Sequence, residues 1–126
     1  MKHLNLKSVT LAGLLGLAFG AGCNRSTPPP TPLSVQELPA ALEKAFSKAK
    51  PDVKDLANQV VAAVQAQDYS KAFLTIQNLA SRPGLTKDQV SVTSRATLTV
   101  NSLLQAAETK GDKQAAQTLK VYRADK

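Results

Sequence analysis

The chain lacks most of the side chains on which enzyme chemistry commonly depends. Its 126 residues include one cysteine, Cys23, one histidine, His3, and no tryptophan. Zinc and other transition metals are bound mainly by His and Cys, and Ser–His–Asp or Cys–His catalysis needs a well-placed histidine. Aromatic residues make up only 4% of the chain, so surfaces for stacking nucleic-acid bases are scarce. We therefore expect no cofactor, no metal, no nucleic-acid partner, no small-molecule substrate and no enzymatic activity.

The longest hydrophobic run lies at the N-terminus and is short for a membrane-spanning helix. Lys2, His3 and Lys7 precede an uncharged stretch rich in Leu, Ala and Gly over residues 8–22. A basic start, an apolar centre of roughly 7–15 residues and small residues before the cleavage point define a secretory signal peptide, whereas a spanning helix needs about 20 apolar residues. We therefore expect residues 1–22 to be a signal peptide that is removed, and His3 with it.

The residues around the cysteine resemble the lipobox of bacterial lipoproteins. Ala21 and Gly22 are small, as the family requires before its cysteine, and Cys23 follows them. The resemblance implies that Cys23 becomes the acylated first residue of the mature protein, and several acyl chains hold a protein firmly on a membrane. Gly20 departs from the family, which prefers a branched aliphatic residue there. The alternative is ordinary cleavage, which would leave a soluble periplasmic protein with a free thiol.

The residue after the cysteine bears on which membrane would hold the protein. In well-studied Gram-negative lipoproteins, Asp at this position favours retention in the inner membrane. Asn24 stands there instead, so the resemblance implies the outer membrane, facing the periplasm.

A proline-rich segment separates the cysteine from the rest of the chain. Four prolines, Pro28, Pro29, Pro30 and Pro32, lie between Arg25 and residue 33. Proline fixes φ and lacks an amide hydrogen, so such a run favours an extended conformation of about 3.1 Å per residue. We expect residues 23–33 to form a tether that holds the folded domain a few tens of ångströms from the lipid.

Residues 34–126 have the periodicity of a small all-α domain. Apolar residues recur at three- and four-residue steps, and they predict helices over 35–49, 52–66, 69–81, 87–109 and 112–123. Ser34 and Glu37 form a possible capping box, and Asp68 and Asp112 stand where caps are expected. Pro39 is tolerated only in a first helical turn, so the first helix could begin at Gln36 or later. We expect a bundle of about five helices arranged as antiparallel hairpins.

One stretch of this domain admits two interpretations. Between residues 89 and 100, Val90, Val92, Leu98 and Val100 alternate with polar residues, which is typical of a strand. Val92, Ala96 and Val100 also continue a helical stripe, and a strand here would find no partner in the chain. The long helix is the interpretation we adopt.

Two segments of the domain resemble the turn between the helices of a tetratricopeptide repeat. Asp68 and Asp112 each begin a helix, with alanine four residues later at positions 72 and 116. The resemblance implies repeated α–α hairpins, which in that family bind peptides or other proteins. The two turns are 44 residues apart in this sequence, whereas the family repeats every 34. An irregular helical bundle is therefore the alternative.

Three functions follow from these features. The leading hypothesis is a membrane-tethered, non-enzymatic interaction or scaffold module for an envelope protein, with an exposed polar face made of Asn58, Gln65, Gln77, Asn78 and Arg82. The second is a structural binder of peptidoglycan or anionic glycolipid, because the net charge is +7 and cations attract such surfaces. Its basic residues are Lys44, Lys48, Lys50, Lys54, Lys110, Lys113, Lys120, Arg123 and Lys126. A minor third hypothesis is a hydrolase that uses two carboxylates from among Glu37, Glu43, Asp52, Asp55 and Glu108.

Overall fold

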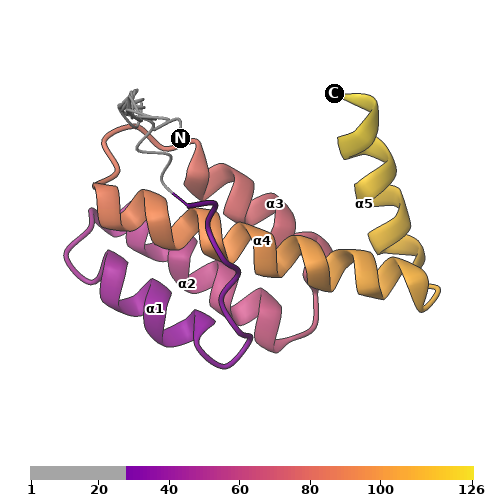
Figure 1. Cartoon of the computed structure of the whole chain (residues 1–126), viewed down its shortest axis with the longest axis horizontal. Coiled ribbons are helices and arrows are strands. Elements are labelled where there is room, and N and C mark those ends of the chain that lie inside the picture. The colour runs from indigo at the N-terminus through magenta and orange to yellow at the C-terminus, as the bar shows by residue number, and fades with distance from the viewer. Residues whose placement is uncertain (1–27) are drawn as a thin grey trace, which may run out of the picture.

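The computed structural model of the chain describes residues 28–126, and these residues form five α-helices and no strand (Figure 1). The helices are α1 (Leu38–Phe46), α2 (Pro51–Gln65), α3 (Tyr69–Ala80), α4 (Lys87–Thr109) and α5 (Lys113–Ala124). The expected all-α bundle of antiparallel hairpins is confirmed, and so is the helix at residues 89–100. The predicted signal peptide over residues 1–22 and the predicted acylation of Cys23 concern residues outside the described part of the chain.

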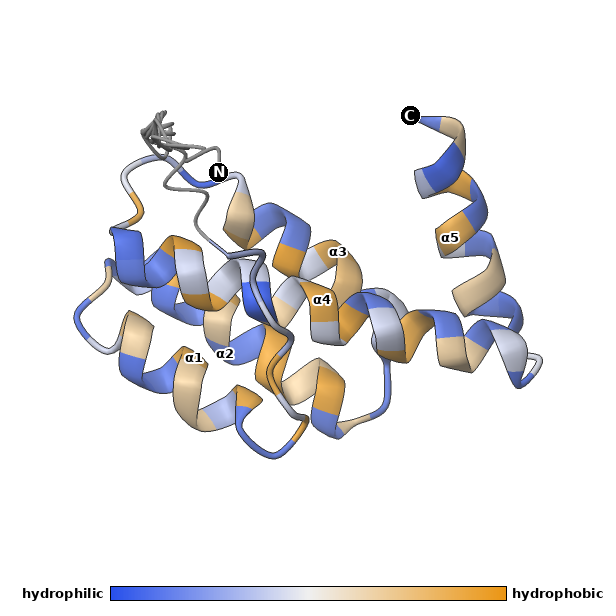
Figure 2. Cartoon of the chain, in the orientation of Figure 1, coloured by the Kyte–Doolittle hydropathy of each residue, from blue (hydrophilic) through white to orange (hydrophobic). Residues whose placement is uncertain are grey.

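The first four helices pack as a ring, and α5 lies outside it. Helix α1 contacts α2 and α4, α3 contacts α2 and α4, and α5 packs on the end of α4 and on α3. Figure 1 shows α5 standing off from the ring, at the far end of α4. Each helix is amphipathic (Figure 2), so the ring buries a single core between its members.

The core is made of aliphatic side chains and two phenylalanines. The largest side chains that are almost wholly buried come from all five helices, and they are Leu38, Leu42, Phe46, Val60, Ile76, Leu79, Val100, Leu104 and Leu119. The three- and four-residue spacing over residues 69–81 predicts Ala80 on the same face as Ala72, Phe73 and Ile76, with Leu79 on the flank of that face. For these two residues the prediction was wrong, because Leu79 is fully buried while Ala80 is exposed.

Helix α1 is shorter than predicted at both ends. The expected reciprocal pair does form, since the Glu37 amide donates to Ser34 Oγ at 3.1 Å and the Ser34 amide donates to Glu37 Oε2 at 3.0 Å. It closes a turn before the helix rather than capping it. Pro39 has no amide hydrogen to donate to residue 35, so the α-helix begins at Leu38. After Phe46 a tighter turn follows, in which the Ala49 amide donates to the Phe46 carbonyl at 3.1 Å.

Helix α4 is the longest helix and has a complete cap at its start. The side chain of Thr86 accepts from the Gln89 amide at 3.2 Å, and Gln89 Oε1 accepts from the Thr86 amide at 3.0 Å. Thr97 and Thr109 fit a helix because their hydroxyls donate to carbonyls four residues back, at 2.8 Å to Thr93 and 3.0 Å to Gln105, whereas the buried Thr93 hydroxyl has no hydrogen-bond partner. The alternating pattern that resembled a strand is therefore satisfied inside one helix.

The two turns that resemble each other in sequence follow the same backbone path. Gln67 and Gly111 both have positive φ, at 58° and 94°. In each turn the amide of the following aspartate donates to the carbonyl five residues earlier, at 2.9 Å for Asp68 and 3.0 Å for Asp112, which is the Schellman arrangement. Each aspartate then caps the next helix, as predicted. Packing differs, because the alanine buried after the first turn is Ala72, at the predicted offset, and after the second is Ala115, one residue earlier.

The end of the expected tether lies against the helical domain. Arg95 Nε donates to the Thr31 carbonyl at 2.9 Å, the Thr99 hydroxyl donates to the Leu33 carbonyl, and the Leu33 side chain is buried. Figure 1 shows this segment crossing α4. Residues 31–33 of the expected tether are therefore bound to the helical domain.

Candidate functional site

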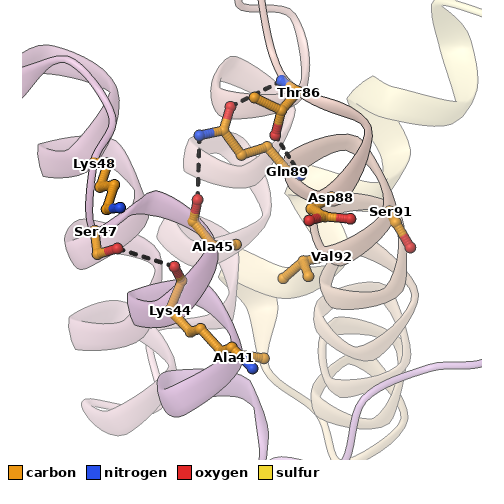
Figure 3. Close-up of a pocket in the computed structure, with 10 residues that line it drawn as sticks. All are labelled: Ala41, Lys44, Ala45, Ser47, Lys48, Thr86, Asp88, Gln89, Ser91 and Val92. Carbon is orange, nitrogen blue, oxygen red and sulfur yellow. Dashed lines mark hydrogen bonds between the residues drawn. The ribbon is translucent and has the colours of Figure 1, made fainter.

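An open groove lies between α1 and the first turns of α4. Its volume is about 560 Å³. Ala41 and Ala45 of α1 and Val92 of α4 contribute its apolar lining, and all three are half-buried. Figure 3 shows the side chains of both helices around the groove.

Gln89 fixes the width of this groove at its upper end. Besides completing the cap with Thr86, its Nε2 donates to the Ala45 carbonyl of α1 at 3.2 Å (Figure 3). The side chain is 9% exposed, so this polar contact between the helices is sheltered from water. Burying it without its partner would leave unsatisfied polar groups, which costs free energy. The contact therefore holds the start of α4 against α1.

Charged and hydroxyl groups surround the apolar lining. Lys44 and Lys48 stand on the α1 side, Asp88 on the α4 side, and Ser47 and Ser91 add hydroxyls. Two cations facing one anion leave the groove with a positive balance, which favours an acidic ligand. The groove offers hydrogen bonds and charge at its edges and apolar contact along its length, which suits a peptide segment.

The lysines near the start of the domain surround three neighbouring hollows. Lys44 and Lys48 line the α1–α4 groove, Lys48 and Lys50 line a hollow against residues 83–86, and Lys54 lines a third one between α1 and α2. The basic residues near the C-terminus are separate from these, because they lie on α5 and around its ends. Among them, the Lys126 ammonium lies 4.9 Å from the centre of the Tyr122 ring.

The polar face predicted from the sequence is divided by the structure. Asn58 and Gln65 come together in the α1–α2 hollow. Arg82 lies with Asp52, at 3.9 Å, and Gln77 and Asn78 line none of the hollows described here. The five residues therefore do not share one of the hollows described here.

The five carboxylates named for a hydrolase do not assemble into a pair. Glu37 is bonded to Ser34, Asp52 pairs with Arg82, and Asp55 accepts from Gln59 at 2.6 Å. Glu108 is bound by Arg123, and Glu43 lines the α1–α2 hollow. No two of these five line the same hollow among those described here.

The pKa of Glu37 is displaced from its ordinary value by its neighbours. Hydrogen bonds from the backbone and side chain of Ser34 lower the pKa of Glu37, and the positive charge of Arg95 acts in the same direction. These interactions stabilise the ionised form of Glu37, and the ionised carboxylate accepts a hydrogen bond in the turn before α1.

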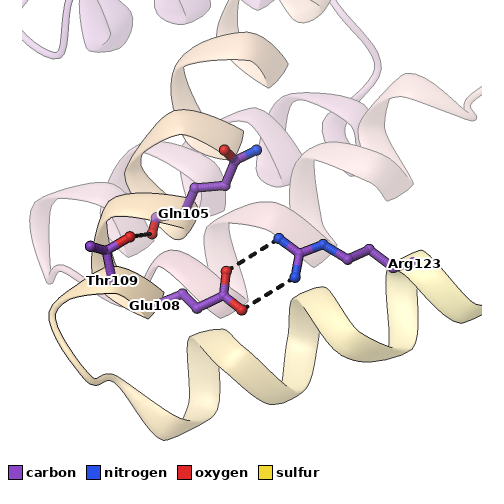
Figure 4. A network of polar contacts seen from close by, with 4 residues as sticks. All are labelled: Gln105, Glu108, Thr109 and Arg123. Atoms are coloured by element: carbon purple, nitrogen blue, oxygen red, sulfur yellow. Dashed lines mark hydrogen bonds and ion pairs between the residues drawn. The ribbon is translucent and has the colours of Figure 1, made fainter.

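Helix α5 packs on the end of α4 and on α3, and three pairs of side chains help to orient it. Arg123 binds Glu108 through two hydrogen bonds of 3.3 and 3.2 Å, near the end of α4 (Figure 4). On α3, the Phe73 ring meets Tyr122 edge-on, with centres 5.0 Å apart. Thr118 also donates to the Ser70 hydroxyl at 3.0 Å. These contacts orient α5 without enclosing a cavity.

Across residues 28–126, His, Cys, Asp and Glu side chains nowhere gather in threes around a position suited to a metal ion. Within the same residues, no helix has both the length and the apolar character needed to span a membrane. Cys23, the predicted lipid-attachment residue, lies before these residues.

Several residues of the α1–α4 groove were missed by sequence reasoning. Asp88, Gln89 and Ser91 are not among the candidate site residues that the sequence suggested. The sequence does hold one signal, since Thr86 and Gln89 have the spacing of a capping box. Nothing in the sequence indicates that Gln89 also reaches the Ala45 carbonyl, because that contact joins residues 44 positions apart.

Comparison with known proteins returns no significant match, whether to protein-family models, to curated proteins or to solved structures.

Proposed function

We propose that this protein is an exported lipoprotein in which acylated Cys23 ties a non-enzymatic helical interaction module to the cell envelope. The module would face the periplasm from the outer membrane. The leader, the small residues before Cys23 and the absence of any other cysteine support the anchor. An unpaired cysteine in an exported chain would leave a free reactive thiol, and acylation of Cys23 would remove that thiol.

The observation that carries the binding role is the α1–α4 groove. The groove is open and has an apolar lining. At its rim, the two positive charges of Lys44 and Lys48 exceed the one negative charge of Asp88. Gln89 holds its two walls together, so the groove exists before a ligand arrives. A preformed site avoids the ordering cost that weakens binding by flexible surfaces. The ligand we propose is an acidic segment of an envelope protein.

Two measurements test this function. Mass spectrometry of the mature protein from its membrane should find an N-terminal residue 23 carrying acyl chains. A photo-crosslinking amino acid at Ser91, in the groove, should capture a protein, whereas the same label at Ser102 should not. Both serines are exposed on α4, and they lie roughly 16 Å apart along the helix axis at about 1.5 Å per residue.

A charge-reversal pair checks that the captured protein occupies the groove. The double variant Lys44→Glu/Lys48→Glu should abolish the crosslink at Ser91. The matched change Lys113→Glu/Lys120→Glu, on α5, alters the net charge equally and should leave the crosslink intact. Equal loss in both variants would contradict a groove-specific partner.

A second candidate is a structural binder of peptidoglycan or anionic glycolipid. It is favoured by Lys48 and Lys50, which line the hollow against residues 83–86. Binding of this kind should weaken steeply as salt rises, because the screening length is about 10 Å at 0.1 M. Cosedimentation with purified peptidoglycan at low and high salt distinguishes it from a protein partner held mainly by apolar contacts.

A further inference from the structure

The outer face of α4 carries an apolar strip beside the point where the tether reaches the domain. Val90 and Leu98 are 50% and 39% exposed. Val90 and Leu85 line two neighbouring open hollows. Leu98 and Pro30 complete the first, and Pro28, Pro29 and Pro30 line the second. Exposed aliphatic side chains that lie together on a surface are typical of an interaction site.

The tether has little freedom at this place. The Thr31 carbonyl is bound by Arg95, the Leu33 carbonyl by Thr99, and the Leu33 side chain is buried. These contacts fix the course of the chain across α4, next to the apolar strip. The N-terminal end of the described chain, from Pro28 to Leu33, is therefore held beside α4.

The distance from this point to the anchor is short. Five residues of chain lead from Pro28 to Cys23, and a fully extended chain spans at most about 3.3–3.6 Å per residue, or roughly 17 Å. The headgroup layer of each leaflet takes up about 5–8 Å of that reach. Helix α4 alone is about 35 Å long at about 1.5 Å per residue. An anchor at Cys23 therefore cannot hold the domain several domain diameters from the bilayer, and the domain surface near Pro28 stays close to the lipid.

The chemistry of the strip suits the surface of an anionic bilayer. Lys87 and Arg95 lie among the residues that line it, together with Val90 and Leu85, and no carboxylate does. Basic side chains are attracted to anionic headgroups, and aliphatic side chains enter the interface between headgroups and acyl chains.

The geometry points to a lipid-facing surface: Leu85, Val90 and Leu98, flanked by Lys87 and Arg95, rest on the membrane to which Cys23 is attached. This inference rests on the proposed acylation of Cys23. It orients the ring with α4 toward the lipid and α2 away from it, because α2 lies across the ring from α4 and contacts α1 and α3. The α1–α4 groove then opens at the side, close to the membrane.

Fluorescence quenching of the acylated, full-length mature protein tests this orientation. Cys23 is the only cysteine, and acylation blocks its thiol, so one introduced cysteine carries the only label. The variants are Val90→Cys and Leu98→Cys on the strip and Ala62→Cys, exposed on α2, as the control. Each is reconstituted in vesicles of phosphatidylethanolamine and phosphatidylglycerol that contain a nitroxide headgroup lipid. We expect quenching at positions 90 and 98 to be several-fold greater than at position 62.

The possible failures can be told apart. Equal quenching at positions 62, 90 and 98, on protein that mass spectrometry shows to be acylated, would overturn the lipid-facing surface and leave the anchor standing. Strong quenching at position 62 alone would reverse the orientation. Protein with a free thiol at Cys23 that does not bind vesicles would overturn the proposed anchor itself. Circular dichroism of each variant verifies that the helices are intact.

Discussion

The four-helix ring and helix α5 are both made of amphipathic helices, but they are stabilised very differently. Each helix of the ring buries large side chains against two neighbours, as Leu42, Phe46 and Ile76 do. Helix α5 buries only Ala115 and Leu119 and packs on the end of α4 and on α3. The ring is thus a cooperative unit, whereas α5 is an attached arm.

This difference predicts two levels of stability in one small domain. Segments with few buried apolar contacts open at a lower free energy than the core does. The face of α5 that points away from α4 is mostly polar. The side chains of α5 that bind the ring are Thr118 and Tyr122, which contact α3, and Arg123, which contacts α4. We therefore expect α5 to detach locally while the ring, and the α1–α4 groove within it, stays folded.

The largest effect should come from a core residue of the ring. Phe46→Ala removes a side chain that is 1% exposed, and such a truncation commonly costs about 3–5 kcal/mol through lost burial and the cavity that remains. Urea unfolding followed by circular dichroism measures the change. Leu74→Ala is the control, because Leu74 is 61% exposed and its loss should cost no more than about 0.5 kcal/mol. Similar losses in both variants would contradict the assigned core.

A change on α5 should lower stability only locally. Leu119 is 2% exposed, and Leu119→Ala should cost about 2–4 kcal/mol of the free energy that attaches α5. Amide hydrogen exchange should then speed up over residues 113–124 and stay nearly unchanged in α2 and α3. A uniform increase across all helices would show that α5 is part of the cooperative unit after all.

The two matching turns allow a smaller test of the same comparison. A non-glycine residue in the left-handed conformation costs about 1–2 kcal/mol, so Gln67→Gly should stabilise the α2–α3 turn by up to about 1 kcal/mol. Gly111→Ala should destabilise the attachment of α5 by about 1 kcal/mol, with no steric contribution, since an added Cβ at Gly111 meets nothing within 4 Å. Global unfolding should report the first change and hydrogen exchange of α5 the second. The two substitutions should change stability in opposite directions, and changes of the same sign would contradict this account of the two turns.

The helices and caps of this fold could be predicted because their determinants are local. Asp68 and Asp112 cap the helices that follow them, and α4 spans the predicted residues 87–109. The misassigned details depend on distant residues. Leu33 was placed in the tether, but its side chain is buried. Its carbonyl accepts a hydrogen bond from Thr99, which lies 66 positions further along the chain. The groove escaped prediction for the same reason, since no local pattern shows that α1 and the start of α4 are neighbours.

The smallest effect should come from the ion pair that joins α5 to α4. The side chains of Arg123 and Glu108 are 59% and 30% exposed, and exposed pairs typically contribute about 0.2–1 kcal/mol because water and salt screen them. A double-mutant cycle with Glu108→Gln and Arg123→Gln, followed by hydrogen exchange in residues 113–124, isolates that coupling. It should fall toward zero as salt rises, because the attraction is screened, while the effect of Leu119→Ala should persist because apolar burial is not. If the coupling exceeded the effect of Leu119→Ala, α5 would be held by charge rather than by packing, and the contrast between ring and arm would have to be drawn in electrostatic terms.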